Sequence, residues 1–92
     1  MRLGMDHIVN AVCLHLAERY EVPVESVEVE LLYDEEQGFG AETWVQGRSR
    51  ILVEANLKEA IARYVLSEFG ERVFPSQITL DVEEEMWADI AK

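Results

Sequence analysis

Hydrophobic and polar residues alternate along the middle of the chain in three short runs. In residues 27–33, valine and leucine alternate with glutamate, and similar alternation recurs in residues 39–45 and 50–54. A period of two is typical of a β-strand with one buried face. We therefore expect three consecutive antiparallel strands joined by tight reversals.

Two segments flanking these strands show the period of a helix. Residues 6–20 and residues 57–70 each place their large apolar side chains on one stripe at ~100° per residue. Asp6 and Asn56 are the predicted N-caps of the two helices, and Gly70 is the predicted C-terminal stop of the second. Both helices present an apolar stripe that can cover the apolar face of the sheet.

The C-terminal region alternates again. Residues 77–83 fit a fourth strand, whereas residues 84–92 fit either a short helix or a strand, and we favour extended structure after a turn at Glu84 and Glu85. The predicted order is α-β-β-β-α-β. It defines an α+β fold, a two-layer sandwich in which an antiparallel meander has both helices on one face. The whole chain, residues 1–92, forms a single domain, and the fourth strand is expected beside an outer strand of the meander.

The faces assigned to the third strand, residues 50–54, determine which apolar residues lie on the outer face of the sheet. The alternation in this strand predicts Ile51 and Val53 toward the core and Leu52 on the opposite face. Leu32 and Trp44 also fall on that outer face, among glutamates. Three apolar side chains on an uncovered sheet face predict an interface, because exposed apolar patches often mark binding surfaces.

The sequence leaves three alternatives for what covers this outer face. The first is a second copy of the chain, with a dimer favoured, since symmetric homo-oligomers are frequent. The second is the chain's own C-terminal segment, which would cover the patch through Trp87. The third is a small molecule bound in a groove. The candidate interface residues are therefore Leu32, Trp44, Leu52 and Trp87.

Charge and composition narrow the class of protein. The formal net charge is −11, and residues 25–47 hold seven acidic side chains and no basic one. Such a chain is a poor nucleic-acid partner, because that affinity depends on Lys and Arg contacts to phosphates. Cys13 is the single cysteine, which fits a reducing compartment. No apolar run approaches the ~18 residues needed to span a bilayer. We expect a cytoplasmic protein with no membrane partner.

No cluster of residues in the sequence indicates a catalytic, metal-binding or cofactor-binding site. The acidic runs at residues 34–36 and 83–85 lack the spacing of a calcium loop. Cys13 and His15 lie two residues apart, so ~200° of helical rotation separates their side chains, and His7 lies beyond the opposite edge of the stripe that holds the thiol. We expect no catalytic, metal or cofactor-binding residues and predict a non-enzymatic module for self-association or protein interaction. The alternative is a small-molecule-binding regulatory module that uses the outer sheet face.

Two families resemble this chain. The order α-β-β-β-α is similar to the double-stranded-RNA-binding domain, but the place of that family's basic cluster reads Asn-Leu-Lys-Glu-Ala in residues 56–60. We therefore expect no RNA function. Residues 8–13, 27–31, 38–42 and 54–61 together resemble the YxcD-like family of short uncharacterised Firmicute proteins. That resemblance implies an α+β fold in a bacterial cytosol and transfers no site residue.

Overall fold

The structure is a computed structural model that describes residues 1–91. The described chain contains two helices and six strands, with short 3-10 turns at Val24–Ser26 and Pro75–Gln77. In chain order the elements are β1 (Arg2–Leu3), α1 (Met5–Tyr20), β2 (Val27–Asp34), β3 (Gly38–Val45), β4 (Arg48–Val53), α2 (Glu54–Phe69), β5 (Ile78–Val82) and β6 (Met86–Ile90).

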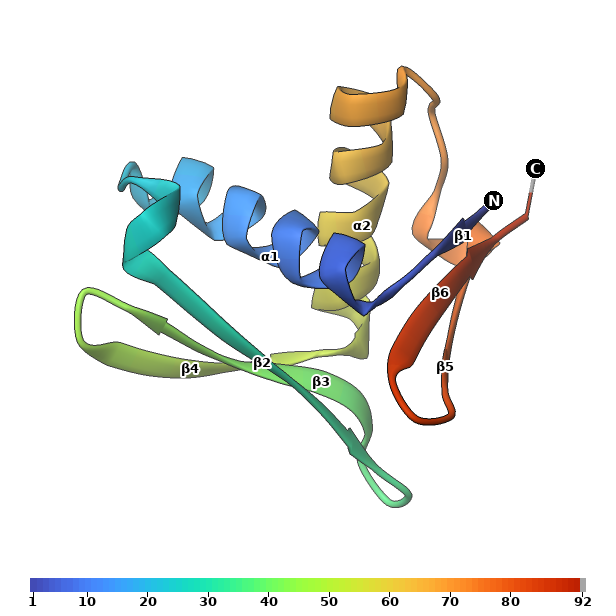
Figure 1. The fold of residues 1–92 in the computed structure, drawn as a ribbon, viewed down its shortest axis with the longest axis horizontal. Coiled ribbons are helices and arrows are strands. Elements are labelled where there is room, and N and C mark those ends of the chain that lie inside the picture. Colours follow the sequence, from blue (N-terminus) through green and yellow to red (C-terminus); the bar gives the residue numbers. More distant parts are fainter. Residues whose placement is uncertain (92) are drawn as a thin grey trace.

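The strands form two antiparallel sheets of three strands each. The first sheet has the order β2-β3-β4, and the second has the order β1-β6-β5. Figure 1 shows both helices on the same face of the first sheet, with the second sheet beside α2 and the N-terminal end of α1. The predicted α+β fold is confirmed, with the three-stranded meander and the two helices that cover it.

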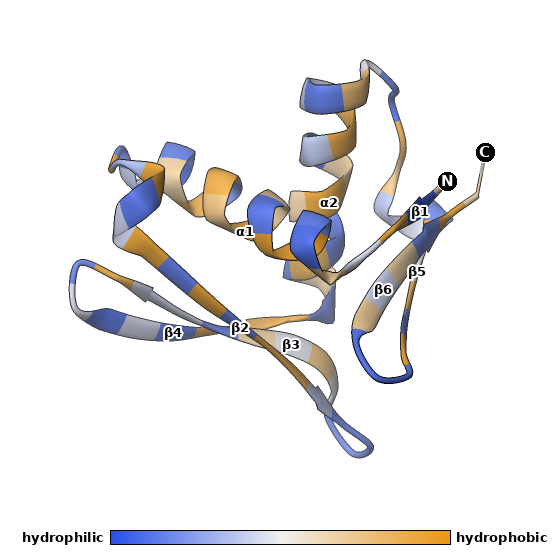
Figure 2. Cartoon of the chain, in the orientation of Figure 1, coloured by the Kyte–Doolittle hydropathy of each residue, from blue (hydrophilic) through white to orange (hydrophobic). Residues whose placement is uncertain are grey.

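The core lies between the helices and the inner faces of the two sheets. Buried residues recur at helical spacing on both helices, and at every second position in β6, at the start of β5 and from Ala41 to Val45 in β3. Figure 2 shows this alternation as hydrophobic and hydrophilic bands along β2. The largest fully buried side chains come from the two helices and the second sheet: Leu3, Ile8, Leu16, Leu57, Ile61, Ile78 and Ile90.

Both helices begin earlier than the sequence predicted. Gly4, and not Asp6, is the N-cap of α1, and Asp6 lies in the first turn, where its charge favours the positive end of the helix dipole. Val53 is the N-cap of α2. The predicted cap Asn56 lies inside the first turn, where its side-chain oxygen accepts a hydrogen bond from the Val53 N–H at 3.1 Å. The predicted stop at Gly70 is confirmed, since this residue adopts a left-handed φ of 68°.

The fourth predicted strand does not join the meander. β5 pairs with β6, and β6 pairs with β1, so the prediction that the fourth strand lies beside an outer strand is wrong. The terminal amine of Met1 donates to the carbonyl of Ile90 at 3.1 Å, which ties the two ends of the chain together. The predicted extended structure after Glu84 and Glu85 is confirmed in β6, while Lys92 lies outside the described residues.

The faces of β4 are opposite to the prediction. Gln46 and Gly47 form a two-residue turn with φ of 53° and 78°, and this turn pairs Val45 directly with Arg48. Directly opposed residues of an antiparallel pair point to the same face, so Leu52 lies on the inner face with Ala41 and packs against the core. A shift of one residue exchanges the two faces of a strand. Ile51 and Val53 consequently lie outside, 62% and 58% exposed.

Gly40 allows the close approach of β3 and β4. A Cβ atom at this position would lie 2.7 Å from the carbonyl oxygen of Leu52, inside van der Waals contact with a backbone atom. We predict that Gly40→Ala lowers the free energy of unfolding by about 1–3 kcal/mol in urea titrations, as overpacking usually does. Gly4→Ser is the contrast, because a Cβ at Gly4 meets nothing within 4 Å and serine is a good N-cap. Equal stability of Gly40→Ala and the wild type would contradict this account.

The assignment of the β4 faces has its own test. Leu52→Thr removes apolar contact with the core and should cost about 1–2 kcal/mol of unfolding free energy, less than a fully buried leucine would. Ile51→Thr, on the exposed face of the same strand, should change it by less than about 0.5 kcal/mol in dilute protein. A larger loss of unfolding free energy in Ile51→Thr than in Leu52→Thr would indicate that Ile51 faces the core and Leu52 faces the solvent.

Candidate functional site

The outer face of the first sheet is the surface that the sequence singled out, and no helix covers it (Figure 1). Cross-strand pairing places Leu32, Gly40 and Val53 in one row across the three strands. Because Gly40 has no side chain, a groove of about 290 Å³ opens there, and Ile51 also lines it. We call Leu32, Ile51 and Val53 the apolar patch. All three are exposed and lie near one end of the three strands, on a sheet face that also carries glutamates.

The four residues predicted as an interface separate in the structure. Leu32 lies in the apolar patch, and Trp44 lies half-buried on the same outer face, opposite Glu28. Leu52 faces the core, which corrects its predicted place on this face. Trp87 belongs to the second sheet, where the guanidinium of Arg2 lies 3.8 Å from its ring centroid. Periodicity could not predict the contact between Arg2 and Trp87, because β1 is only two residues long.

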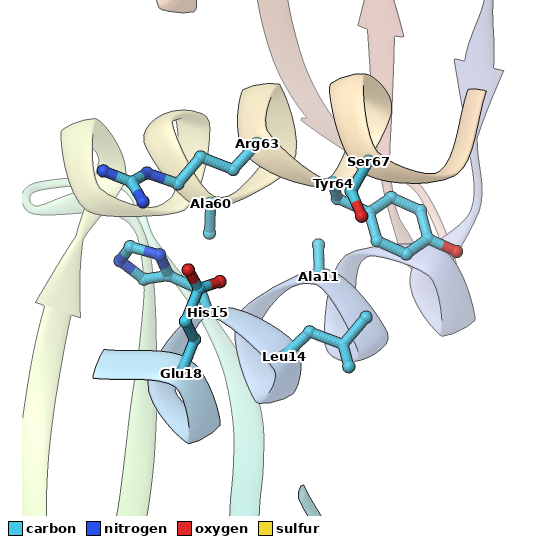
Figure 3. Close-up of a pocket in the computed structure, with 8 residues that line it drawn as sticks. All are labelled: Ala11, Leu14, His15, Glu18, Ala60, Arg63, Tyr64 and Ser67. Atoms are coloured by element: carbon cyan, nitrogen blue, oxygen red, sulfur yellow. The ribbon is translucent and has the colours of Figure 1, made fainter. Parts of the chain in front are cut away.

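A small cleft separates α1 from α2 on the side away from the first sheet. Its volume of about 60 Å³ has room for only a few water molecules. In Figure 3, Arg63 of α2 lies above His15 and Glu18 of α1 at one end, and Tyr64 lies at the other. Burial and the neighbouring Arg63 guanidinium lower the pKa of His15, while Glu59 opposes them.

The thiol and the imidazole of α1 point to different neighbours, as their spacing predicted. The Cys13 thiol donates to the carbonyl of Val27 on β2 at 3.9 Å, and burial raises the pKa of this thiol. His15 lines the cleft toward α2. A raised thiol pKa lowers the thiolate fraction that nucleophilic chemistry needs. Cys13 and His15 are therefore not arranged as a nucleophile and its general base.

A second, cationic hollow lies on the inner face of the first sheet beside the end of α1. It has a volume of about 420 Å³ and is lined by Tyr20, Val45, Gln46, Arg48 and Arg50. We call it the arginine pocket. Neither Arg48 nor Arg50 has a carboxylate within 4.0 Å among residues 1–91. Neither arginine could be placed here from the pattern of residues, because the face on which they lie depends on the turn at Gln46 and Gly47.

No group of three or more His, Cys, Asp or Glu residues within residues 1–91 is arranged to hold a metal ion. Neither helix in this part of the chain combines the length and the apolar character that crossing a bilayer requires.

The lowered pKa of His15 predicts a pH dependence. The folded state resists protonation of this imidazole, so its contribution to stability is lost as the pH falls from the unfolded pKa near 6.5 through the lower folded pKa. We expect His15→Gln to reduce the loss of unfolding free energy between pH 7.5 and pH 5, measured by urea titration. His7→Gln, an exposed position on the same helix, is the matched control. An unchanged slope in His15→Gln would contradict the prediction.

Comparison with known proteins identifies a family and no activity. No curated protein and no solved structure matches the chain. Residues 1–85 match the family described as "Protein of unknown function (DUF2653)". This match spans nearly all of the helices and strands described above, up to the turn before β6. The chain therefore belongs to the DUF2653 family of proteins of unknown function.

Proposed function

We propose that this protein is a non-enzymatic module that forms a homodimer through the β4 edge and the apolar patch. The observation that carries the proposal is the exposure of Leu32, Ile51 and Val53, at 38%, 62% and 58%, on a sheet face without a helix over it. Two of these residues lie on β4, an edge strand of the first sheet. A free strand edge also offers unpaired backbone N–H and C=O groups to a second strand.

Charge selects β4 over the other edge of the same sheet. β2 carries Glu28, Glu30 and Asp34, so two β2 edges would bring carboxylates together. β4 has no acidic residue from Arg48 to Val53. In a chain of net charge −11, association of two copies is opposed by self-repulsion, which is smallest at an edge without carboxylates.

Antiparallel pairing of two β4 strands gives a closed dimer. With the two-fold axis at Ile51, this residue lies beside the partner's Ile51, and Arg50 lies beside the partner's Leu52. No two arginines then face each other, and the outer faces of the two sheets continue into one apolar stripe. The same surface serves both copies, as in the common two-fold homodimers.

The two alternative functions, binding of a small molecule and binding of RNA, account for fewer features of the structure. A small molecule could occupy the groove above Gly40, but this would leave the backbone edge of β4 unpaired. The RNA-binding alternative meets an obstacle at Lys58, whose ammonium group lies 3.0 Å from the Glu54 carboxylate and is neutralised by it. The narrower likeness to YxcD-like Firmicute proteins and a location in the bacterial cytosol also remain predictions.

The dimer is tested by the mass of the protein in solution. We expect light scattering to give twice the 10.6 kDa chain mass at micromolar concentrations. Ile51→Glu should weaken association at least tenfold, or about 1.4 kcal/mol, because it brings two carboxylates to the two-fold axis. Circular dichroism of the variant should match the wild type, since Ile51 is exposed in the single chain.

Phe74→Glu is the matched control for this experiment. Phe74 is 60% exposed in the loop between α2 and β5, so the substitution makes the same change of charge away from β4. It should leave the dimer intact. A monomeric wild-type protein at several hundred micromolar would refute the proposal, and so would a dimer that Ile51→Glu leaves unchanged.

A further inference from the structure

We propose that the arginine pocket binds a small molecule through a dianionic oxyanion, with a phosphate monoester as the expected chemical class. Nothing in the family description assigns a ligand to this site. The site lies on the inner face of β4, and the proposed dimer uses the backbone edge and the outer face of that strand. The two proposals therefore use opposite faces of β4 and meet only at its backbone edge, where Arg50 lies beside the partner's Leu52 in the proposed dimer.

The two arginines are placed for joint recognition of one group. Arg48 and Arg50 are two residues apart on one strand, so their side chains leave the same face about 7 Å apart. The strand pairing fixes the backbone beneath them, and the Thr43 hydroxyl donates to the carbonyl of Arg50 at 3.2 Å. Two guanidinium groups at this separation can converge on the oxygens of one phosphate, which they match as planar, forked donors.

Tyr20 holds one arginine on the wall of the pocket. The guanidinium of Arg50 lies 5.2 Å from the centroid of the Tyr20 ring, within the range of a cation–π contact. Tyr20 ends α1, and Glu21 after it turns the chain away with a left-handed φ of 54°. The ring limits the motion of Arg50 and also offers an apolar surface to the body of a ligand.

The charges around the pocket favour an external anion. None of its five lining residues is acidic, and neither guanidinium has a carboxylate partner among residues 1–91. The chain has nineteen acidic residues, yet within residues 1–91 none places a carboxylate within 4.0 Å of either guanidinium. The repulsion of an anion by the rest of the protein is largely screened beyond about 8 Å at physiological salt, whereas contact with the two arginines is not.

The size of the pocket favours a small molecule over a macromolecule. Its volume of about 420 Å³ falls within the range of roughly 300–1,000 Å³ found for small-molecule sites. An acidic peptide segment offers similar charge, but as carboxylates spread along a chain. We therefore commit to a compact oxyanion and treat the peptide as a competing outcome.

The experiment uses inorganic phosphate and phenyl phosphate as probes at pH 7.5 in 150 mM NaCl. We expect both to raise Tm in a concentration-dependent way, and calorimetry to show one site per chain. The double variant with Arg48→Gln and Arg50→Gln should weaken binding at least tenfold. Arg72→Gln, an exposed arginine outside the pocket, should bind like the wild type.

Three outcomes would overturn the proposal. One is a Tm increase that equals the effect of sodium chloride at the same ionic strength. The second is a double variant that retains full affinity for phosphate. The third is binding of a poly-glutamate peptide without binding of either phosphate probe.

The same samples separate this proposal from the dimer. Ile51→Glu should dissociate the dimer and still bind phenyl phosphate, because residue 51 lies on the opposite face of β4. The double arginine variant should lose phosphate binding and remain dimeric in light scattering. Loss of phosphate binding in Ile51→Glu at unchanged fold would contradict the separation of the two surfaces.

Discussion

The turn at Gln46 and Gly47 decides the identity of both candidate surfaces. Two residues with positive φ reverse the chain without an extra residue, so Val45 pairs with Arg48 and the faces of β4 are fixed from that point on. A loop longer by one residue would turn Ile51 and Val53 inward and the arginines outward. The apolar patch and the arginine pocket would then both disappear.

Periodicity predicted the elements well where one face of an element is clearly polar. β2 alternates valine and leucine with glutamate, and its inner residues Val27, Val29 and Leu31 lie on the core side as expected. β4 contains Ile51, Leu52 and Val53 in succession, so its apolar residues fit either face. Only the turn geometry and the close approach of β4 to Gly40 distinguish the two arrangements.

Local sequence patterns could not predict the strand pairing of the second sheet, for a different reason. β1 is two residues long, which is too short to show any period, and it pairs with β6 at the other end of the chain. That pairing depends on contacts between residues far apart in sequence. The strand character of residues 86–90 was predictable, whereas the partner of that strand was not.

The apolar patch could be inferred in part from the sequence, whereas the arginine pocket could not. Leu32 and Trp44 were placed outside correctly because β2 and β3 alternate cleanly. Arg48 and Arg50 were missed because a charged residue on a strand is ordinarily assigned to the solvent side. Here β4 is an edge strand and α1 ends at Tyr20, so the inner face of the sheet is open at this corner and can accept charge.

The distribution of charge makes one strand suited to two separate tasks. Carboxylates occupy β2, the turn between β2 and β3, and Glu42 of β3, which leaves β4 as the strand of the first sheet without them. Its pleat sends isoleucine and valine to one side and two arginines to the other. The apolar side can therefore contact a second chain while the arginine side binds an anion on the opposite face of the same strand. An acid-free edge strand with unlike faces thus reconciles self-association with anion binding in a strongly acidic protein.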